Sequence, residues 1–283
     1  MSSEYSDVVK MSRDYYNSTN ADEFYYNIWG GEDIHIGLYE KAKDDIRTAS
    51  RRTVARLAAC IADHPREKPI KKVLDIGSGY GGAARYLAEQ YGWNIHCLNL
   101  SEAENERNRR KNRKVGLEER IEVVDGSFES LPFDDSSFDL VWSQDAILHS
   151  GNKEKVFEEA YRVLRPEGEF IFTDPMQSDD CPEGVLEPIL ARIHLDHMGS
   201  FALYQQLASK KGFSVLYTEE LTEQLSVHYA RVAEETRKNY TVMSQVASTD
   251  YLDRMLAGLE HWVNGGKKGY LAWGILHLQK KMS

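Results

Sequence analysis

A short apolar segment, Val73–Ile76, runs directly into a glycine-rich turn and then into a helical pattern. The segment contains one acidic residue, Asp75, and three glycines follow at alternate positions: Gly77, Gly79 and Gly81. This order predicts a buried strand, a tight turn and a helix. Glycines lack a Cβ, so the backbone can turn sharply and a ligand can lie directly against it. The stretch therefore predicts a nucleotide-like ligand at the carboxyl end of a strand.

The following strand separates a dinucleotide from other ligands of this kind. A dinucleotide fold places a pyrophosphate at the helix N-terminus and an acidic residue about 20 residues later for the ribose. In this chain the ribose position falls on Asn99, which is neutral. Asp75 stands just before the turn, where it would repel a pyrophosphate and attract a cation. The pattern therefore argues against a dinucleotide.

The pattern Asp-x-Gly-x-Gly-x-Gly resembles the first motif of class I S-adenosylmethionine-dependent methyltransferases. The cofactor of that family carries an amino acid and a sulfonium in place of a phosphate. The resemblance implies that Asp125 accepts a hydrogen bond from the adenine amino group, and that Asn99 and Ser101 bind the ribose. Most family members have an acid where this chain has Asn99. The cofactor-binding residues implied are Asp75, Gly77, Gly79, Gly81, Asn99, Leu100, Ser101, Asp125, Gly126, Ser127, Phe128 and Gln144.

Composition excludes several other classes of function. The chain has 283 residues, 41% of them hydrophobic, which suffices for one large domain with a sizeable core. A formal charge of −10 argues against a nucleic-acid substrate, because such a protein needs a basic face. We interpret the basic run 107–114 as the solvated face of a helix. No apolar run approaches the ~20 residues of a membrane span, so we expect no membrane partner.

The cysteines and the N-terminus indicate a cytoplasmic protein. Cys60, Cys97 and Cys181 are odd in number and scattered, which predicts reduced thiols without a disulfide framework or a metal site. The N-terminal residues lack the charged-then-apolar layout of a signal peptide.

Alternating strand and helix patterns between residues 70 and 175 predict a parallel sheet covered by helices on both faces. Further strands are expected at 213–217 and 270–278, with a long helix between them that ends near Val263. Together with the methyltransferase resemblance, these patterns predict a Rossmann-like α/β fold with a mostly parallel, seven-stranded sheet.

The expected domain organisation follows from these elements. Residues 1–65 form an N-terminal lid and a helical segment, and residues 66–283 form the methyltransferase domain. A helical insertion on the substrate side is expected at about 176–211. In such sheets ligands bind at the carboxyl ends of the strands, so the loops that follow the strands should line the site.

The stretch Ser137–Ser150 runs off the fourth expected strand and contains an acid and a histidine four residues apart, Asp145 and His149. If the intervening residues are helical, the two side chains share a face. A carboxylate beside an imidazole raises its basicity and fixes its orientation. The alternative is a structural pair that caps the turn; the position at a strand end favours a functional pair.

Aromatic residues gather near the N-terminus. Phe24, Tyr25, Tyr26 and Trp29 lie within six residues and precede a Gly-Gly turn. They either pack the N-terminus onto the core or form a lid whose rings face an alkylated ammonium, which prefers aromatic faces.

Taken whole, this aromatic segment, the run Leu98–Arg109 and the stretch Ile193–Ser200 resemble sarcosine/dimethylglycine N-methyltransferases, which make glycine betaine. The string 143–149 is also similar to that of phosphoethanolamine methyltransferases, in which an N-terminal tyrosine and this histidine form the catalytic pair. The resemblance implies catalytic roles for His149, Asp145, Tyr26 and Tyr25. It implies substrate binding by Trp29, Arg192, His194 and Tyr204.

Arg192 is the favoured partner for a substrate carboxylate, because a planar guanidinium matches it with two hydrogen bonds. Other arginines, such as Arg47, stay open. His194 and His197 flank Asp196 but lack a third and fourth ligand in the sequence, so we expect no metal.

The sequence therefore predicts a methyltransferase for a small amine, as a monomer or homodimer, with no nucleic-acid partner. Phosphoethanolamine methylation is the rival enzymatic function, although a phosphate substrate should require more Arg and Lys in the insertion than Arg192, Lys210 and Lys211. A protein that binds the cofactor without catalysis is the second alternative.

Overall fold

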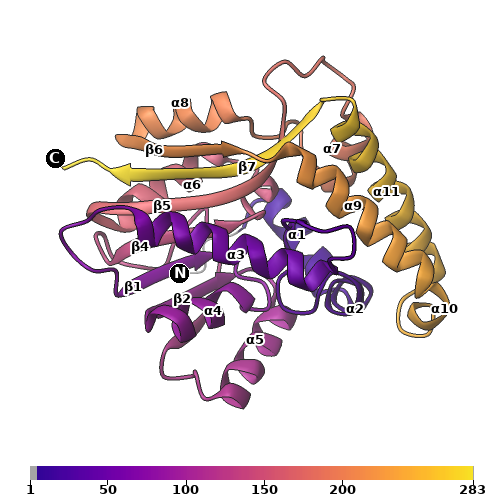
Figure 1. The fold of residues 1–283 in the computed structure, drawn as a ribbon, viewed down its shortest axis with the longest axis horizontal. Helices are drawn as coiled ribbons and strands as arrows, with labels where there is room; N and C mark the ends of the chain where they lie inside the picture. The colour runs from indigo at the N-terminus through magenta and orange to yellow at the C-terminus, as the bar shows by residue number, and fades with distance from the viewer. Residues whose placement is uncertain (1–4, 283) are drawn as a thin grey trace.

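A seven-stranded sheet with helices on both faces forms the centre of the computed structural model, which describes residues 5–282 (Figure 1). The spatial order is β3-β2-β1-β4-β5-β7-β6, and all neighbours pair in parallel except β7, which is antiparallel to β5 and β6. The strands are β1 (Lys72–Ile76), β2 (Asn94–Asn99), β3 (Ile121–Asp125), β4 (Phe138–Gln144), β5 (Leu164–Gln177), β6 (Phe213–Glu220) and β7 (Leu271–Lys280). The expected sheet is confirmed.

Three layers of side chains hold the sheet and its helices together. One core cluster lies between the sheet and α3 and α4, a second between the sheet and α6 and α8, and a third joins α2, α9 and α11. The helices are α1 (Asp7–Asn17), α2 (Thr19–Ile28), α3 (Ile46–Asp63), α4 (Gly82–Tyr91), α5 (Glu102–Val115), the 3-10 turn η1 (Ile147–His149), α6 (Lys153–Val163), α7 (Glu187–Ile193), α8 (Phe201–Lys211), α9 (Thr222–Lys238), α10 (Tyr240–Met243) and α11 (Thr249–Lys267).

The expected long helix between the last two strands is wrong in one respect. The chain turns back after α9, so that α9 and α11 form a helical hairpin with the short α10 at its tip (Figure 1). Asn239 ends α9, and the Ser248 hydroxyl caps α11 by accepting a hydrogen bond from the Tyr251 amide (3.3 Å). A straight helix would leave the apolar face of α11 in water; the hairpin packs it against α9 and β7.

The basic run 107–114 is more than a solvated helix face. On α5, Arg107 pairs with Asp22 and Glu23, and Lys111 pairs with Glu32. These ion pairs attach the N-terminal segment, which contains α1 and α2, to the sheet domain. The segment thereby lies across the carboxyl ends of the central strands.

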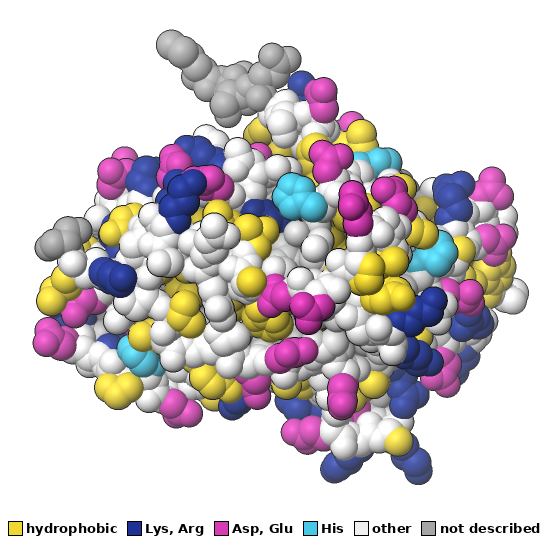
Figure 2. Space-filling model, turned by 90° about the horizontal axis from the view of Figure 1, so that it is seen from above, with side chains coloured by type: hydrophobic (Ala, Val, Ile, Leu, Met, Phe, Trp, Pro, Cys, Tyr) yellow, Lys and Arg dark blue, Asp and Glu magenta, His cyan; other side chains and the backbone are white. Residues whose placement is uncertain are grey.

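The surface is consistent with the acidic composition. On the face shown in Figure 2, acidic, basic and apolar side chains are interspersed. Within residues 5–282, no helix combines the length and the apolar content that a membrane span requires. Cys60, Cys97 and Cys181 are free thiols, as expected.

Candidate active site

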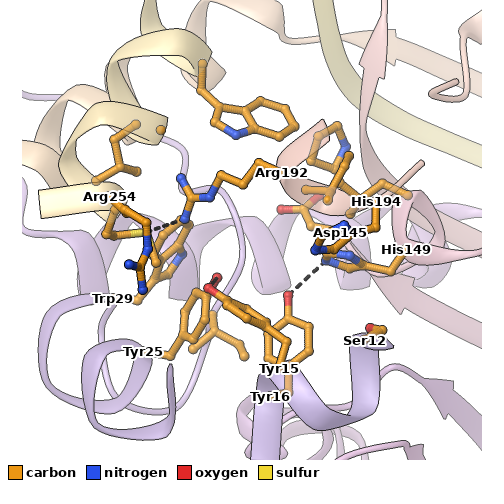
Figure 3. Close-up of a pocket in the computed structure, with 18 of the residues that line it drawn as sticks. Ser12, Tyr15, Tyr16, Tyr25, Trp29, Asp145, His149, Arg192, His194 and Arg254 are labelled. Atoms are coloured by element: carbon orange, nitrogen blue, oxygen red, sulfur yellow. Dashed lines mark hydrogen bonds between the residues drawn. The ribbon is translucent and has the colours of Figure 1, made fainter. Parts of the chain in front are cut away.

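Three adjoining cavities lie at the carboxyl ends of the strands. The large cavity, of about 660 Å³, lies between the N-terminal segment, η1, α7 and α11 (Figure 3). The glycine cavity, of about 70 Å³, follows the glycine-rich turn. The acidic cavity, of about 30 Å³, contains Asp33 and Asp75. The glycine cavity shares Ser12, Tyr16, Ile34, Asp145 and His149 with the large cavity, so the two open onto each other.

The glycines of the turn are needed for its conformation and for close packing. Gly77, Gly79 and Gly81 all have positive φ angles, at +79°, +49° and +75°. A Cβ on Gly77 would lie 2.3 Å from the Ala146 Cβ, and one on Gly79 would lie 3.2 Å from Ile34. Any side chain at these two positions would fill the glycine cavity.

Many of the predicted cofactor residues meet at the glycine cavity. Its walls include seven of them: Gly77, Gly79, Asn99, Leu100, Ser101, Phe128 and Gln144. The Nε2 of Gln144 is buried without a hydrogen-bond partner, so a ligand in this cavity would find a free donor.

Glu104 also lines the glycine cavity, and the sequence analysis missed it. Its Oε2 accepts a hydrogen bond from Asn99 Nδ2 (2.8 Å), whereas its Oε1 is buried without a partner. Burial raises the pKa of Glu104 to about 7. Glu104 of α5 therefore places a carboxyl group beside Asn99 at the end of β2.

The acidic cavity contains two buried carboxyl groups. Burial and the neighbouring Asp33 raise the pKa of Asp75 to about 8. Asp33 is 2% exposed, and Arg51 lies 2.9 Å from its Oδ2. Two carboxyl groups in one small cavity favour a cationic ligand group, because it would relieve their mutual repulsion.

Four predicted cofactor residues lie on the walls of neither small cavity. Gly81 packs against Asn108 of α5, and Ser127 accepts a hydrogen bond from the Glu129 amide (3.2 Å). Asp125 is half exposed, and Arg109 (2.7 Å) and Asn105 (2.8 Å) donate to its carboxylate. Gly126 lies against Leu98 beside it. Their roles in binding stay predictions.

His149 pairs with a tyrosine where the large and glycine cavities meet. The Tyr16 hydroxyl lies 2.9 Å from His149 Nε2, and the two rings meet edge to face (Figure 3). Burial and the charge of Lys153 lower the pKa of His149 to about 4, while burial raises the pKa of Tyr16. Near neutral pH the histidine is therefore uncharged and the tyrosine keeps its proton, so the hydrogen bond joins two neutral groups, and the imidazole tautomer decides which of them donates.

The predicted Asp145–His149 pair does not form. Asp145 has a positive φ of +51°, and η1 is a single 3-10 turn, so the two residues do not share a helical face. The Asp145 carboxylate instead accepts hydrogen bonds from the Ile36 amide (2.6 Å) and Trp273 Nε1 (2.7 Å). Asp145 lines both cavities but ties the N-terminal segment to β7.

The expected catalytic role of Tyr26 needs correction. Its ring packs on Arg107 (4.5 Å from ring centroid to Cζ) and edge-on against Tyr80, in a hollow on the outer side of α2. Tyr25 and Trp29 line the large cavity, and their roles there stay predictions. Adjacent positions on a helix point in directions about 100° apart, and here Tyr26 is turned toward Arg107 and Tyr80.

Tyr204 is also placed wrongly by the sequence analysis. Its side chain is fully buried between Phe157 and Phe172, away from the large cavity. Its hydroxyl donates to the buried Asp174 (2.5 Å), which also accepts from the Leu148 amide (2.9 Å). Tyr204 therefore fastens α8 to β5.

Arg192 and His194 do line the large cavity. Arg192 lies on α7 and His194 ends that helix with a φ of +56°. The structure adds Tyr15, Tyr16 and Tyr251 to the walls, none of which the sequence analysis named. The aromatic pair Tyr15–Tyr16 on α1 was the available signal, because two adjacent rings on an otherwise polar helix indicate a buried contact, and both rings line the large cavity.

Comparisons with known proteins agree with this architecture. Residues 74–172 match the model of a methyltransferase domain. A sarcosine/dimethylglycine N-methyltransferase from Aphanothece halophytica is 54% identical over 96% of this chain and 98% of its own length. One from Halorhodospira halochloris is 53% identical over 99% of this chain and 100% of its own length.

Solved structures give the same result. The crystal structure of a candidate sarcosine dimethylglycine methyltransferase from Galdieria sulphuraria has a TM-score of 0.90 at 43% identity, covering 94% of this chain and 99% of that one. A Haemonchus contortus phosphoethanolamine N-methyltransferase has a TM-score of 0.80 at 19% identity, covering 98% of this chain and 61% of its own, which shows the shared fold alone. The chain therefore belongs to the sarcosine/dimethylglycine N-methyltransferases, enzymes with the class I methyltransferase fold.

Proposed function

We propose that this enzyme transfers methyl groups from S-adenosylmethionine to the nitrogen of sarcosine and of dimethylglycine, and that glycine betaine is the end product. The observation that carries the proposal is the junction of two cavities at the Tyr16–His149 pair. On one side lies the glycine cavity. On the other side lies an aromatic-walled cavity of suitable chemistry for a small zwitterion.

The small cavities fit the parts of the cofactor. Asp75 and Asp33 would attract its ammonium group, and the glycine turn would admit its backbone without a Cβ in the way. Asn99 and the unpartnered Glu104 oxygen would accept hydrogen bonds from ribose hydroxyls, with Phe128 against the adenine. When bound, the cofactor supplies a methyl group on a sulfonium: the amine lone pair forms the new N–C bond and the S–C electrons pass to sulfur.

A variant of the turn tests this fit. Gly79→Val should abolish the binding of S-adenosylhomocysteine in isothermal titration calorimetry, because the side chain would occupy the glycine cavity. Gly116→Val is the matched control, since Gly116 has a similar positive φ (+72°) and an open surface around it. Normal affinity in Gly79→Val would contradict the cofactor site.

The aromatic walls suit the charge change during transfer. Positive charge moves from sulfur to nitrogen, and rings close to the nitrogen stabilise it by roughly 0.5–2 kcal/mol each. Tyr25 and Trp29 line the cavity for this role. The Tyr16 hydroxyl, held by His149, would aim the amine toward the cofactor.

Proton removal limits the reaction. An alkyl amine with a pKa of about 10 is mostly protonated near neutral pH and then lacks the attacking lone pair. A neutral histidine whose pKa is about 4 is a weak base for that proton. We therefore assign His149 the orientation of Tyr16, and the enzyme selects the minor neutral form of the amine.

The residues that line the large cavity favour a carboxylate substrate over a phosphate substrate. Arg192 is the proposed carboxylate partner. Lys210 and Lys211, which the phosphoethanolamine alternative would need, instead pair with Glu154 of α6 (2.8 and 3.1 Å). Neither lysine lines the large cavity.

A substrate panel tests the function directly. Glycine, sarcosine, dimethylglycine and phosphoethanolamine are incubated separately with the enzyme and S-adenosylmethionine, and the products are resolved by mass. We expect betaine from sarcosine and dimethylglycine, little or no product from glycine, and none from phosphoethanolamine. Faster methylation of phosphoethanolamine than of dimethylglycine would establish the rival function. Cofactor binding without any product would establish the non-catalytic alternative.

A further inference from the structure

Arg192 carries a positive charge in the large cavity that the protein itself leaves without a counter-charge. Its guanidinium donates to the thioether of Met255 (2.7 Å), and no carboxylate within residues 5–282 lies at ion-pair distance. A guanidinium keeps its proton in proteins, so Arg192 stays charged although it is partly buried. A partly buried, unpaired cation is costly, and a ligand anion relieves that cost.

A chain of three hydroxyl groups lies beside this arginine. The Tyr15 hydroxyl oxygen lies 3.3 Å from that of Tyr25, and Arg192 lies near both rings (Figure 3). On its other side, the Tyr15 hydroxyl oxygen lies 3.1 Å from that of Tyr251, on which the charge of Arg192 also acts. Burial raises the pKa of Tyr25 and of Tyr251, so both keep their protons. The three tyrosines have three hydroxyl hydrogens, and the two hydrogen bonds between them use only two. The third hydrogen is therefore available to donate to a ligand oxygen.

The Arg192 guanidinium packs directly against Gly258 on α11. A Cβ on Gly258 would lie 1.5 Å from Arg192 Nη1 and 2.6 Å from its Cζ. The arginine therefore crosses the helix where α11 has no side chain, and any larger residue would push the guanidinium away. Glycine in the middle of a 19-residue helix lowers its stability relative to alanine, so this one has a packing reason.

We propose that substrate specificity depends on Gly258, Tyr15 and Tyr251. Gly258 positions the Arg192 guanidinium, and the hydroxyl groups of the two tyrosines complete a binding site for a carboxylate around it. The site selects short N-methylated amino acids over amino alcohols of the same size. This inference rests on the proposed function and adds to it the residues that recognise the end of the substrate opposite the amine. Gly258 is a positioning residue, since it acts through Arg192.

Binding measurements test the selection. The probes are dimethylglycine and N,N-dimethylaminoethanol, which share the amine and differ in the carboxylate, each titrated calorimetrically into enzyme saturated with S-adenosylhomocysteine. We expect wild type to prefer dimethylglycine at least about 10-fold. Arg192→Gln should weaken dimethylglycine binding about 100-fold, and Tyr251→Phe and Gly258→Ala about 10-fold each, with little change for the alcohol. In turnover assays Gly258→Ala should raise KM and leave kcat within about threefold.

A double-mutant cycle distinguishes a displaced Arg192 guanidinium from a general defect in substrate binding. Lysine lacks the two atoms that a Cβ at position 258 would meet most closely, Nη1 and Cζ, so Gly258→Ala should cost less than about twofold in an Arg192→Lys background. Equal losses of affinity for dimethylglycine in both backgrounds would show that Gly258 does not position Arg192. Gly258→Ala should fold, since alanine favours the helix, and its Tm verifies this.

The outcomes are distinguishable from those of the proposed function. If wild type makes no betaine from dimethylglycine, the proposed function fails. If wild type makes betaine but Tyr251→Phe and Gly258→Ala keep the preference for dimethylglycine, the inference alone fails. Arg254 is an exposed arginine that lines the same cavity. If Arg254→Gln loses the preference for dimethylglycine and Arg192→Gln keeps it, the carboxylate binds at Arg254 instead.

Discussion

At the scale of single residues, the site depends on which groups are charged. Burial makes His149 neutral, with a pKa of about 4, and raises the pKa of Tyr16. The pair therefore shares one hydrogen bond between two uncharged groups. Such a bond orients a hydroxyl at the junction of the cavities without adding a charge that would repel a cationic sulfonium.

Tyr16 should matter more for turnover than for binding. Tyr16→Phe is expected to lower kcat by about 10–100-fold, because the amine loses its orienting hydroxyl, while the Kd for S-adenosylhomocysteine changes less than about threefold. Steady-state kinetics and calorimetry measure both. Tyr26→Phe is the matched control and should retain activity, since Tyr26 faces Arg107. A larger loss in Tyr26→Phe than in Tyr16→Phe would contradict the assignment.

The pH dependence should reflect the substrate and not the histidine. The pKa of His149 is lowered, so His149 gains its proton only as the pH falls toward about 4 and stays neutral above pH 6. We expect kcat/KM for dimethylglycine to rise up to tenfold per pH unit from pH 6.5 to 9, as the neutral amine increases. His149→Asn should keep that slope at a lower rate. A plateau near pH 7 that disappears in His149→Asn would show that His149 acts as the base.

At the scale of elements, α8 is a structural support. The Tyr204 hydroxyl and the Leu148 amide satisfy the buried Asp174, which links α8 and η1 to β5. The position of η1, and with it of His149, depends on this link.

Removing that hydroxyl should reduce stability and not substrate binding. Tyr204→Phe leaves a buried carboxyl group short of a partner, which costs roughly 1–3 kcal/mol and lowers Tm by about 2–12 °C. Differential scanning calorimetry measures the shift, and KM for dimethylglycine should change less than about twofold. Tyr161→Phe is the control, since Tyr161 packs on Phe213 and its hydroxyl makes no hydrogen bond within the described residues. A raised KM with unchanged Tm would restore Tyr204 to the substrate site.

At the scale of the whole molecule, the site exists only when the N-terminal segment is attached. Tyr16, Tyr25 and Trp29 come from that segment, whereas His149 and Arg192 come from the sheet domain and its insertions. The attachment includes the ion pairs of Arg107 with Asp22 and Glu23.

Breaking this attachment should loosen the segment selectively. In Arg107→Gln, hydrogen exchange of amides in residues 7–28 should become about 3–10-fold faster, whereas exchange in β4 and β5 should not change. Mass spectrometry resolves the two regions. Arg110→Gln removes an exposed arginine of the same helix, one with no ion pair in the structure, and should exchange like wild type. Uniform acceleration over the whole chain would instead indicate global destabilisation.

The sequence by itself determined the sheet and the glycine turn, because strand patterns and turn chemistry are local. It also selected many residues that line the cavities, among them His149, Trp29 and Arg192, whose functional roles stay predictions. Only the tertiary structure decided the partners. Asp145 is four residues from His149 but turns to Ile36 and Trp273, and the histidine pairs with Tyr16, 133 residues away. Helix faces likewise separated Tyr25 from Tyr26, and the α9–α11 hairpin brought Gly258 under Arg192. Such contacts depend on how distant elements pack, which local patterns do not encode.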